Sequence, residues 1–378
     1  MKVDLSRPIA DDVGTGLSEA HRQLEAKARQ VVAEHIAPRE HEESDEAAFF
    51  MTKALGQAGL LDACVDLDVV SICVLREVVA ASSGLADSML ALQGLGYGPL
   101  ALYGSDAQKA QWRDKVRLGE AIGAIGITEP EAGSDVGAIS TTARRDGERW
   151  VIDGVKHYIT NAGIADFYSV IARTGGPGPQ GLSAFLVPKE QVTLQERYEL
   201  VAPHPCGRIA FEGATVPASA MIGEEGQGFK VAMRTLDHFR TTVGAAAVGM
   251  ATRALKEACA RAQSRQQFGK PIARFQQIGA LVADSWTELL ASRLLVYRAA
   301  TAHAASDSQA GLYSSAAKMY ATEAAQRIID RAVQIHGGDG VKKGSVVERL
   351  YREIRALRIY EGTTEIQKVV MSRGLLAK

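Results

Sequence analysis

The sequence predicts an α+β protein, mostly α, in which a β domain lies between two helical blocks. Long segments with a helical spacing of apolar residues occupy both ends of the chain, and short β-branched or aromatic runs bounded by Gly or Pro fill the middle. These changes of pattern divide the chain into an N-terminal α-helical domain, a middle β domain and a C-terminal α-helical domain, at residues 1–122, 123–223 and 224–378. With 378 residues, 46% of them apolar, the chain is long enough for two or three cores.

The N-terminal block is predicted to be helical because it is rich in Ala, Leu, Glu and Gln and has little turn chemistry inside long segments. Its clearest helix carries apolar side chains at spacings of seven, four and three residues, as on one face of an amphipathic helix: Leu17, Leu24, Ala28 and Val31. Farther along, we expect Pro99 and Gly104 to mark helix ends.

The middle block begins at about residue 123 and is predicted to form strands. In "TTARRDGERWVIDG", two strand-like runs flank Asp146 and Gly147, a residue pair suited to a tight hairpin turn. Three more β-branched or aromatic runs follow, "FYSVIAR", "LSAFLVP" and "IAFEG", and the region closes near Gly223.

Helices are predicted again from Gly228 onward. Apolar side chains repeat there at spacings of four, three, seven and seven residues, the stripe of a long bundle helix: Phe229, Met233, Leu236, Val243 and Met250. The next two helical stretches are rich in small residues, which permit close contact between helices.

Composition excludes several classes of protein. The formal net charge is −1, from 43 basic and 44 acidic residues, so we expect no nucleic-acid or membrane-surface partner. No apolar run approaches the roughly 20 residues of a bilayer span, and the opening "MKVDLSRPIADD" lacks an apolar signal core, so we expect a cytoplasmic protein. The cysteines have no metal-ligand spacing and are expected to be small buried side chains, with no metal site: Cys64, Cys73, Cys206 and Cys259.

A polar motif, "GITEPEAGSDVGA", opens the β region. The hydroxyl groups of Thr128 and Ser134 and the backbone N–H groups around Gly133 can hold a polyanion or the polar edge of a ring. The alternative is a plain loop in which Ser134 or Asp135 caps the next turn.

Three further motifs have a structural and a functional interpretation each. "HYITNAG" offers Tyr158 for stacking and Thr160 as a hydroxyl donor, or it is merely a strand leaving the sheet. In "SRQQFGKPI", Arg265 at a helix end can clamp a pair of phosphates, or it is a solvated arginine. The glycines of "QIHGGDG", residues 334–340, either cap a helix or let the backbone approach a ligand closely.

In their order along the chain, "TEPEAGSD", "YITNAG", "RQQFG", "QIHGGDG" and "IYEGTTEIQ" resemble the motifs of the flavin-dependent acyl-CoA dehydrogenase family. The resemblance runs from about residue 17 to the C-terminus and agrees with the α-β-α order. It implies a β-barrel or sandwich in the middle and a four-helix bundle at the C-terminal end.

The resemblance implies FAD bound between the β domain and the C-terminal helices. Thr128 would bond the pyrimidine edge of the flavin, Ser134 would face the diphosphate and pantetheine region, and Thr363 and Glu365 would complete the site. The flavin ring near N5 would be flanked by Tyr158, Ile159 and Thr160. A second set would hold the FAD of a neighbouring subunit, which implies a homotetramer: Arg265, Phe268, Gln334, Gly337 and Gly338.

Glu361, in "IYEGTTEIQ", matches the family's catalytic base. In the family, a base removes the α proton of a thioester while a hydride leaves the β carbon for flavin N5. A carboxylate serves as this base when desolvation raises its pKa, and packing under Tyr360 can provide that. We expect Thr364 and Gln367 to form a capping box for the last helix, which leaves Glu361 outside the cap.

Some relatives carry the base on a long helix instead, in a stretch like "LDHFR", where this chain has Phe239. A phenyl ring cannot abstract a proton, so Glu361 is the only motif-matched base. Asp237, Arg240 and Gly362 match family positions near the substrate. Arg240 can equally be a structural partner of Asp237 or Glu361.

The predicted function is FAD-dependent α,β-dehydrogenation of an acyl-CoA thioester, with electron-transferring flavoprotein as the acceptor. The alternative is a flavin oxidase or a biosynthetic dehydrogenase that acts on an acyl thioester of acyl carrier protein. Departures from the family pattern leave the acyl chain and its carrier open, among them Tyr158 in place of the usual Trp. The glycines at 94, 96 and 98 either widen the acyl cavity or permit tight helix contact.

Overall fold

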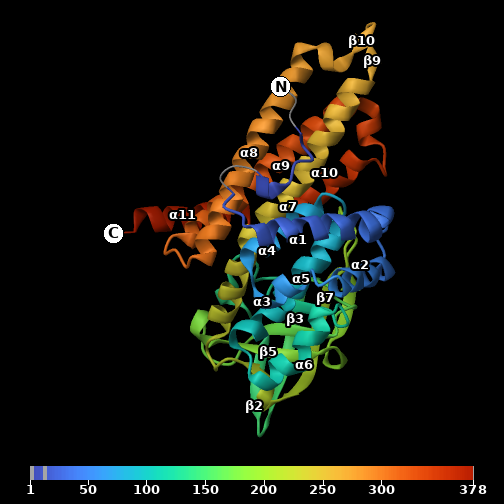
Figure 1. Cartoon of the computed structure of the whole chain (residues 1–378). Helices are drawn as coiled ribbons and strands as arrows, with labels where there is room; N and C mark the ends of the chain where they lie inside the picture. The colour runs from blue at the N-terminus through green and yellow to red at the C-terminus, as the bar shows by residue number, and fades with distance from the viewer. Residues whose placement is uncertain (1–3, 12–14, 378) are drawn as a thin grey trace. The chain divides into compact units, whose positions relative to one another are not determined.

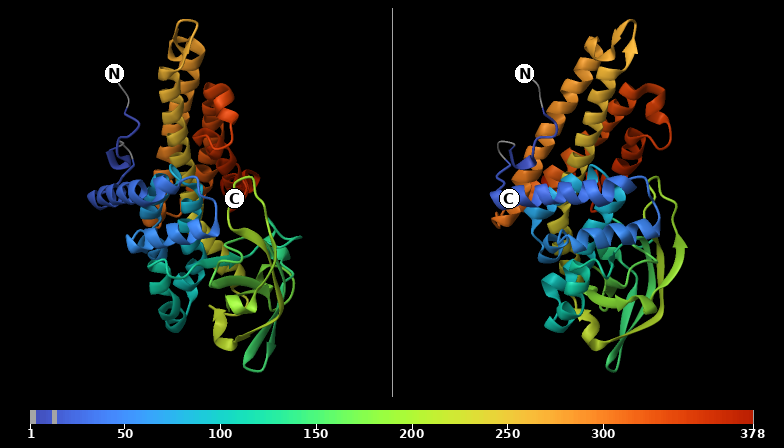
Figure 2. Two further views of the ribbon diagram at one scale, coloured as in Figure 1. Left: turned by 90° about the vertical axis from the view of Figure 1, so that its right-hand side faces the viewer. Right: turned by 45° about the vertical axis from the view of Figure 1, so that its right-hand side comes forward.

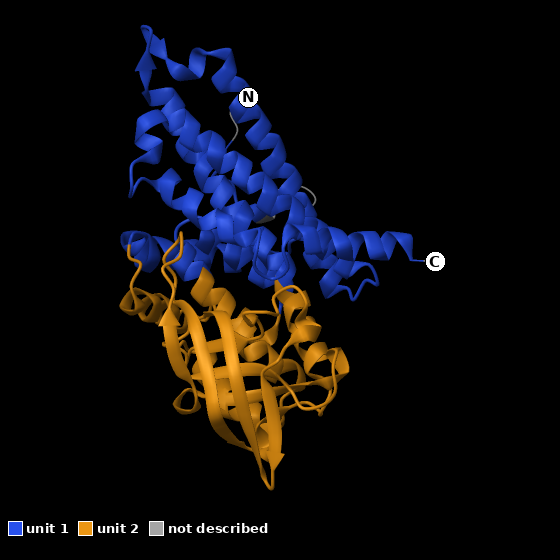
Figure 3. Cartoon of the chain, turned by 180° about the vertical axis from the view of Figure 1, so that it is seen from behind, with its two compact units in different colours: residues 1–41, 68–87, 240–378 blue, residues 42–67, 88–239 orange. Residues whose placement is uncertain are grey.

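The computed structural model describes residues 4–11 and 15–377, so part of the opening stretch on which the cytoplasmic expectation rests, residues 1–3 and 12, lies outside it. The chain divides into two compact units, shown in Figure 3. The helical unit comprises residues 1–41, 68–87 and 240–378, and the sheet unit comprises residues 42–67 and 88–239. Within the described part of the chain, every helix is too short or too polar to cross a membrane.

The helical unit is built from long helices that bury small side chains against one another. Its α-helices are α1 (Glu19–Val31), α4 (Val69–Ala80), α8 (Gln276–Ala304), α9 (Ala310–His336), α10 (Val346–Leu357) and α11 (Thr364–Leu376). It also contains the part of α7 (Gly228–Ser264) from residue 240 onward. Helices α8 and α9 lie side by side (Figures 1 and 2). Their small residues include Ser292, Ala299, Ala317, Ala321 and Ala324, all buried, which permits the predicted close contact between helices.

Helix starts in this unit follow the expected capping chemistry. Ser18 accepts a hydrogen bond from the backbone N–H of His21 and forms a capping box with it, so α1 begins at Glu19, inside the predicted stripe. Ser345 caps α10 in the same way, through the N–H of Glu348.

The sheet unit contains a single eight-stranded sheet, and the expected central β domain is confirmed. Its strand order is β6-β7-β3-β2-β4-β5-β8, and β1 pairs in parallel with β4. The strands are β1 (Gly123–Gly126), β2 (Thr142–Asp146), β3 (Arg149–Thr160), β4 (Phe167–Arg173), β5 (Leu182–Pro188), β6 (Thr193–Arg197), β7 (Cys206–Pro217) and β8 (Met221–Ile222). The predicted hairpin joins β2 and β3: Asp146 pairs with Arg149, and Gly147 has φ 58°.

The sheet unit also contains α2 (Asp45–Gln57), α3 (Asp62–Asp66), α6 (Asp106–Arg117), the part of α5 (Gly84–Tyr103) from residue 88 onward, and α7 up to residue 239. The ring of Trp112 on α6 packs 4.4 Å from that of Phe167 on β4, between ring centroids. The prediction that Pro99 ends a helix is wrong, because Pro99 lies inside α5, which runs on to Tyr103, next to Gly104. Leu95, Tyr97 and Leu100 are buried in this part of the helix, and their packing outweighs the cost of a proline.

Gly94, Gly96 and Gly98 of α5 allow close packing rather than an open cavity. A Cβ atom at Gly94 would lie 2.1 Å from the ring of Phe239, and one at Gly96 would lie 2.6 Å from the backbone of Gly123. At Gly98 the added atom would lie 2.9 Å from the side chain of Thr235. Of the two interpretations, the tight contact is the one that the structure supports.

Candidate active site

Glu361 lies in the short joint between α10 and α11, and its backbone is strained. Its φ is +54°, in the left-handed region, which costs a residue other than glycine about 1 kcal/mol or more. The next residue, Gly362, has φ +89°, and a Cβ atom there would lie 2.6 Å from the side-chain amide nitrogen of Gln367. The surrounding structure must therefore hold this joint in place.

Two side chains hold the joint through its backbone carbonyl groups. Lys318 on α9 donates from Nζ to the Gly362 carbonyl over 2.7 Å. Gln367 on α11 donates from Nε2 to the same carbonyl over 3.0 Å and to the Glu361 carbonyl over 3.3 Å. The joint is thus fixed by both of these helices.

The expected capping box at Thr364 and Gln367 is wrong by one residue. Thr363 is the N-cap of α11: its backbone is extended, with φ −59° and ψ 164°, and its hydroxyl oxygen accepts from the N–H of Ile366. Thr364 is the first helical residue, and the Gln367 amide turns back to the joint instead of capping. Glu361 lies outside the cap, as predicted.

Glu361 is half-buried in the joint, and one of its carboxylate oxygens is fully buried. Its Oε2 atom reaches no donor among the described residues. Burial raises the pKa of Glu361, and the positive charges of Arg76, Lys318 and Arg240 act against that rise. A carboxylate with a raised pKa and an unused oxygen has the properties of a general base.

Arg76, the cation with the largest effect on the pKa of Glu361, already has a partner of its own. Its guanidinium group donates two hydrogen bonds to Asp87, over 2.8 and 2.7 Å, and one to Thr242 over 3.0 Å, and the side chain is 1% exposed. Arg76 therefore stabilises the ionised form of Glu361 from a distance, while Glu361 keeps a free oxygen. The sequence reasoning missed this residue, although an arginine inside the apolar run "VVSICVLREVVA" was a signal for it.

In the sheet unit, Tyr158 is displayed at an irregularity of β3. The pairing of β3 with β7 shifts register between Lys156 and Ile159, and Tyr158 has φ +53°. Its ring is 62% exposed and lies 5.1 Å from the ring of Tyr198, an open aromatic surface. Ile159 is 2% exposed, and Thr160 is half-buried at the end of the strand.

The segment that carries Thr128 is fixed by the buried Glu129. Its carboxylate accepts hydrogen bonds from the backbone N–H groups of Ser140, over 2.7 Å, and Thr141, over 2.9 Å, and from Nζ of Lys156 over 2.8 Å. Burial alone would raise its pKa, but these donors hold the pKa at about 2. Glu129 therefore remains ionised and anchors the loop.

Thr128 itself lies between fixed neighbours. Lys156 also donates to the carbonyl of Ile127 over 3.1 Å, and the backbone N–H of His157 donates to the carbonyl of Thr128 over 2.8 Å. The Thr128 side chain is half-buried, and Ser134, farther along the loop, is exposed. The loop thus presents both hydroxyl groups from a rigid base.

The residues predicted to serve a neighbouring subunit lie at exposed helix ends of the helical unit. Phe268 is 90% exposed, with φ +50°, at the turn between β9 (Gln266–Gln267) and β10 (Lys270–Pro271), just after Arg265. Gly337 caps α9 with φ +62°, close to Gln334 and Gly338, which are exposed. Arg261 of α7 pairs with Asp339 over 2.7 Å. This ion pair joins the end of α7, next to Arg265, to the turn that follows α9.

The remaining predicted residues are distributed between the units. Asp237 is half-buried and belongs to the sheet unit, whereas Arg240 is 9% exposed and belongs to the helical unit, like Glu361 and Gly362. Glu365 is exposed in the first turn of α11.

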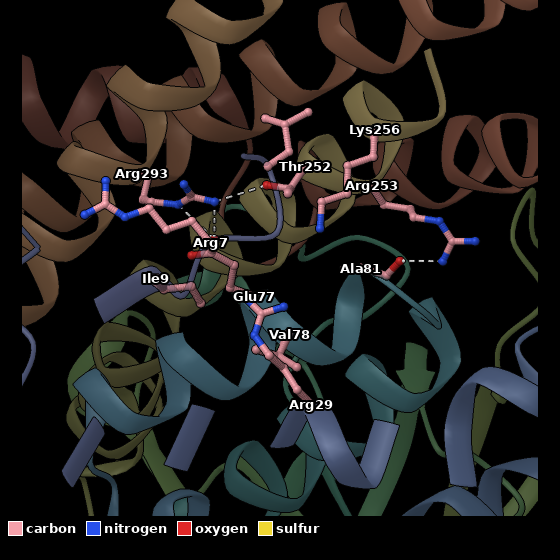
Figure 4. A pocket seen from close by; sticks show the side chains of 11 residues that line it. Arg7, Ile9, Arg29, Glu77, Val78, Ala81, Thr252, Arg253, Lys256 and Arg293 are labelled. Carbon is pink, nitrogen blue, oxygen red and sulfur yellow. Dashed lines mark hydrogen bonds and ion pairs between the residues drawn. The ribbon is translucent and has the colours of Figure 1, made fainter. Parts of the chain in front are cut away.

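A cavity of about 60 Å³ in the helical unit is separate from these residues (Figure 4). Glu77 in its lining accepts hydrogen bonds from Arg293, another lining residue, over 2.7 Å and from the Tyr297 hydroxyl over 3.0 Å. None of the predicted site residues lines it. The cavity therefore does not contribute to the predicted site.

All three segments of the chain match domains of known proteins. The N-terminal, middle and C-terminal domains of acyl-CoA dehydrogenases match residues 18–120, 124–214 and 226–376. The probable acyl-CoA dehydrogenase FadE25 of Mycobacterium tuberculosis is 36% identical over 374 residues, covering 95% of this chain and 96% of that one. The mitochondrial short-chain specific acyl-CoA dehydrogenase of Bos taurus is 35% identical, covering 95% and 91%.

Solved structures of acyl-CoA dehydrogenases are similar to this one over nearly the whole chain. Butyryl-CoA dehydrogenase of Megasphaera elsdenii is 31% identical, with a TM-score of 0.89 over 96% of this chain and 99% of that one. A glutaryl-CoA dehydrogenase of Mycobacterium smegmatis in complex with FADH2 is 26% identical, with a TM-score of 0.88 over 97% of each chain.

Proposed function

Because this chain belongs to the acyl-CoA dehydrogenase family, flavoprotein oxidoreductases that act on CH–CH groups, we propose that it oxidises an acyl-CoA thioester to the α,β-unsaturated product with Glu361 as the base. One observation carries this assignment. The Oε2 atom of Glu361 is buried and has no hydrogen-bond partner among the described residues.

In the proposed reaction, Glu361 accepts the α proton of the thioester. An α C–H group is a weak acid, so the base must be strong enough and must not be solvated. Burial raises the pKa of Glu361 toward the operating pH, and the nearby cations Arg76, Lys318 and Arg240 keep a usable fraction ionised. The proton goes to the unused Oε2 atom.

We propose FAD as the cofactor, which when bound supplies the acceptor for the β hydride. The exposed side chain of Tyr158 fits a large flat ring. The open backbone at Gly337 and Gly338, where an added Cβ atom would meet nothing within 4 Å, fits close approach of a diphosphate from the FAD of a neighbouring subunit. The proposed contacts on the flavin are Thr128, Ser134, Tyr158, Ile159, Thr160, Thr363 and Glu365, and those toward the FAD of a neighbouring subunit are Arg265, Phe268, Gln334, Gly337 and Gly338.

We propose a homotetramer, because the second set of contacts requires a neighbouring subunit. Apolar side chains at the end of α11, Leu375 and Leu376, are 77% and 81% exposed, which fits burial against another copy of the chain. We also propose three domains at residues 1–122, 123–223 and 224–378, substrate contacts at Ser134, Asp237, Arg240 and Gly362, and electron-transferring flavoprotein as the acceptor.

Anaerobic bleaching of the flavin by a panel of thioesters tests this function. The panel holds straight, branched, cyclic and aryl acyl-CoAs and the same acyl groups on acyl carrier protein. We expect one class of acyl-CoA to bleach the flavin, with no oxygen consumed during turnover in air. Bleaching only by the carrier-protein thioesters, or rapid oxygen consumption, would instead support the biosynthetic dehydrogenase or the oxidase.

A further inference from the structure

Lys318 is a buried cation whose charge the fold does not need. Its side chain is fully buried, and Nζ donates to the Gly362 carbonyl over 2.7 Å. Among the described residues, Nζ reaches no other acceptor and no carboxylate within ion-pair distance. Burying an ammonium group costs several kcal/mol unless an opposite charge compensates it. A neutral donor would hold one carbonyl at lower cost, so the charge itself requires an explanation.

The joint already has a second anchor on α9. Glu323, farther along the same helix, accepts from the Thr364 hydroxyl over 2.7 Å and from Arg358 over 2.8 Å. These contacts fix the residues on both sides of the Glu361 turn without using Lys318. What Lys318 adds is a positive charge at the strained part of the joint.

We infer that Lys318 is the positioning residue of the base: its ammonium group anchors the Gly362 carbonyl and keeps a positive charge in electrostatic contact with the Glu361 carboxylate. This inference rests on the proposed function of Glu361 as the base. It assigns to Lys318 two effects, one on the conformation of the joint and one on the protonation of Glu361.

The charges around the pair agree with this role. The pKa of Lys318 is lowered to about 8, chiefly by burial and also by Arg240, while Glu361, Glu323 and Glu365 act in the opposite direction. Around Glu361, the cations Arg76, Lys318 and Arg240 oppose burial and Asp87. Arg76 is occupied by Asp87, so Lys318 is a cation near Glu361 with no carboxylate bound to it.

Two substitutions separate the effects. Lys318→Met removes the charge and the hydrogen bond at similar volume, whereas Lys318→Gln removes the charge but keeps an N–H donor for Gly362. Lys27→Met, at an exposed lysine of α1, is the matched control. Protonation of Glu361 is measured directly, as the carboxylic-acid band in the infrared difference between each protein and its Glu361→Gln counterpart, followed over pH.

We expect both Lys318 variants to raise the pH midpoint of Glu361 by about one pH unit or more, because a carboxylate loses a nearby cation. Lys27→Met should leave the midpoint unchanged. Lys318→Met should in addition lower the rate of anaerobic flavin bleaching at saturating thioester more than Lys318→Gln does, since only the latter keeps the anchor.

An unchanged midpoint in either folded, flavin-loaded Lys318 variant overturns the inference. If Lys318→Met does not fold, Lys318→Gln carries the same test. The infrared titration needs no turnover. Failure of every thioester to bleach the wild-type flavin would therefore contradict the proposed function, while the titration would still report whether Lys318 controls the protonation of Glu361.

Discussion

The backbone of Glu361 occupies a region that residues other than glycine rarely adopt, and the contacts of α9 and α11 keep it there. These contacts fix the position of the joint, and burial leaves the Oε2 atom of Glu361 unused. Both properties favour proton transfer over salt-bridge formation. The feature that suits Glu361 to the proposed role is therefore the Oε2 atom that has no hydrogen-bond partner among the described residues.

The rate of the reductive half-reaction should rise with pH as Glu361 ionises. Since burial raises its pKa above the ordinary 4.5, the midpoint of this rise should lie clearly above 4.5. Stopped-flow bleaching over pH, under anaerobic conditions and at saturating thioester, measures the midpoint. A rate that stays constant from pH 4.5 to neutrality would show that Glu361 does not limit the step.

At this scale the sequence indicates the proposed base, Glu361, but not its surroundings. Glu361 is recognisable because it lies in a contiguous motif, "IYEGTTEIQ", whose order with other motifs is specific. Lys318 and Arg76 come from α9 and α4, and their approach to Glu361 depends on helix packing that no local pattern encodes. The cap lies at Thr363, one residue before the predicted Thr364, because either of two adjacent threonines can begin this helix.

Among the elements, the β3 strand and the loop of Thr128 depend on one another through a buried ion pair. Lys156 on β3 binds Glu129 and the carbonyl of Ile127, so the loop can hold Thr128 in place without a ligand. The predicted hairpin and the strand runs follow from local turn chemistry and alternation. The register shift that exposes Tyr158 does not, because it arises from pairing with the distant strand β7.

Glu129→Gln should destabilise the protein by about 3 kcal/mol, because it leaves Lys156 buried without its counter-charge. In the wild type, the pKa of Glu129 is held at about 2, below the ordinary 4.5. The carboxylate therefore contributes stability that is present above pH 4.5 and is lost as the pH falls toward 2. Urea unfolding between pH 7 and pH 3 measures both effects.

The control is Glu212→Gln, at an exposed glutamate of β7. It should unfold like the wild type at each pH. Equal stability of the Glu129→Gln variant and the wild type at pH 7 would contradict the anchoring role of Glu129.

For the whole molecule, the α-β-α order follows from the sequence because each block has its own periodicity, and the chain matches the family over all three segments. The division into two compact units does not follow, since each unit collects segments that are far apart in the sequence. Pattern alone places residues on elements, and long-range packing decides which elements share a core.

Arg265→Ala should weaken the retention of FAD by about tenfold, because it removes a charge-assisted hydrogen bond proposed to reach the diphosphate in a neighbouring subunit. Arg355→Ala, at an exposed arginine of α10, is the matched control and should bind FAD like the wild type. Flavin content after gel filtration, with the oligomer size from the same run, gives the answer. Equal flavin content in both variants would remove Arg265 from the site.

The most direct test of the central claim is Glu361→Gln, which replaces the carboxylate by a nearly isosteric amide that is not basic. The measurement is the rate of anaerobic flavin bleaching by the thioester that reduces the wild type. We predict a folded, FAD-loaded variant that binds the thioester but bleaches at least a thousandfold more slowly, on the order of 4 kcal/mol in the barrier. Bleaching at the wild-type rate would show that another group removes the α proton.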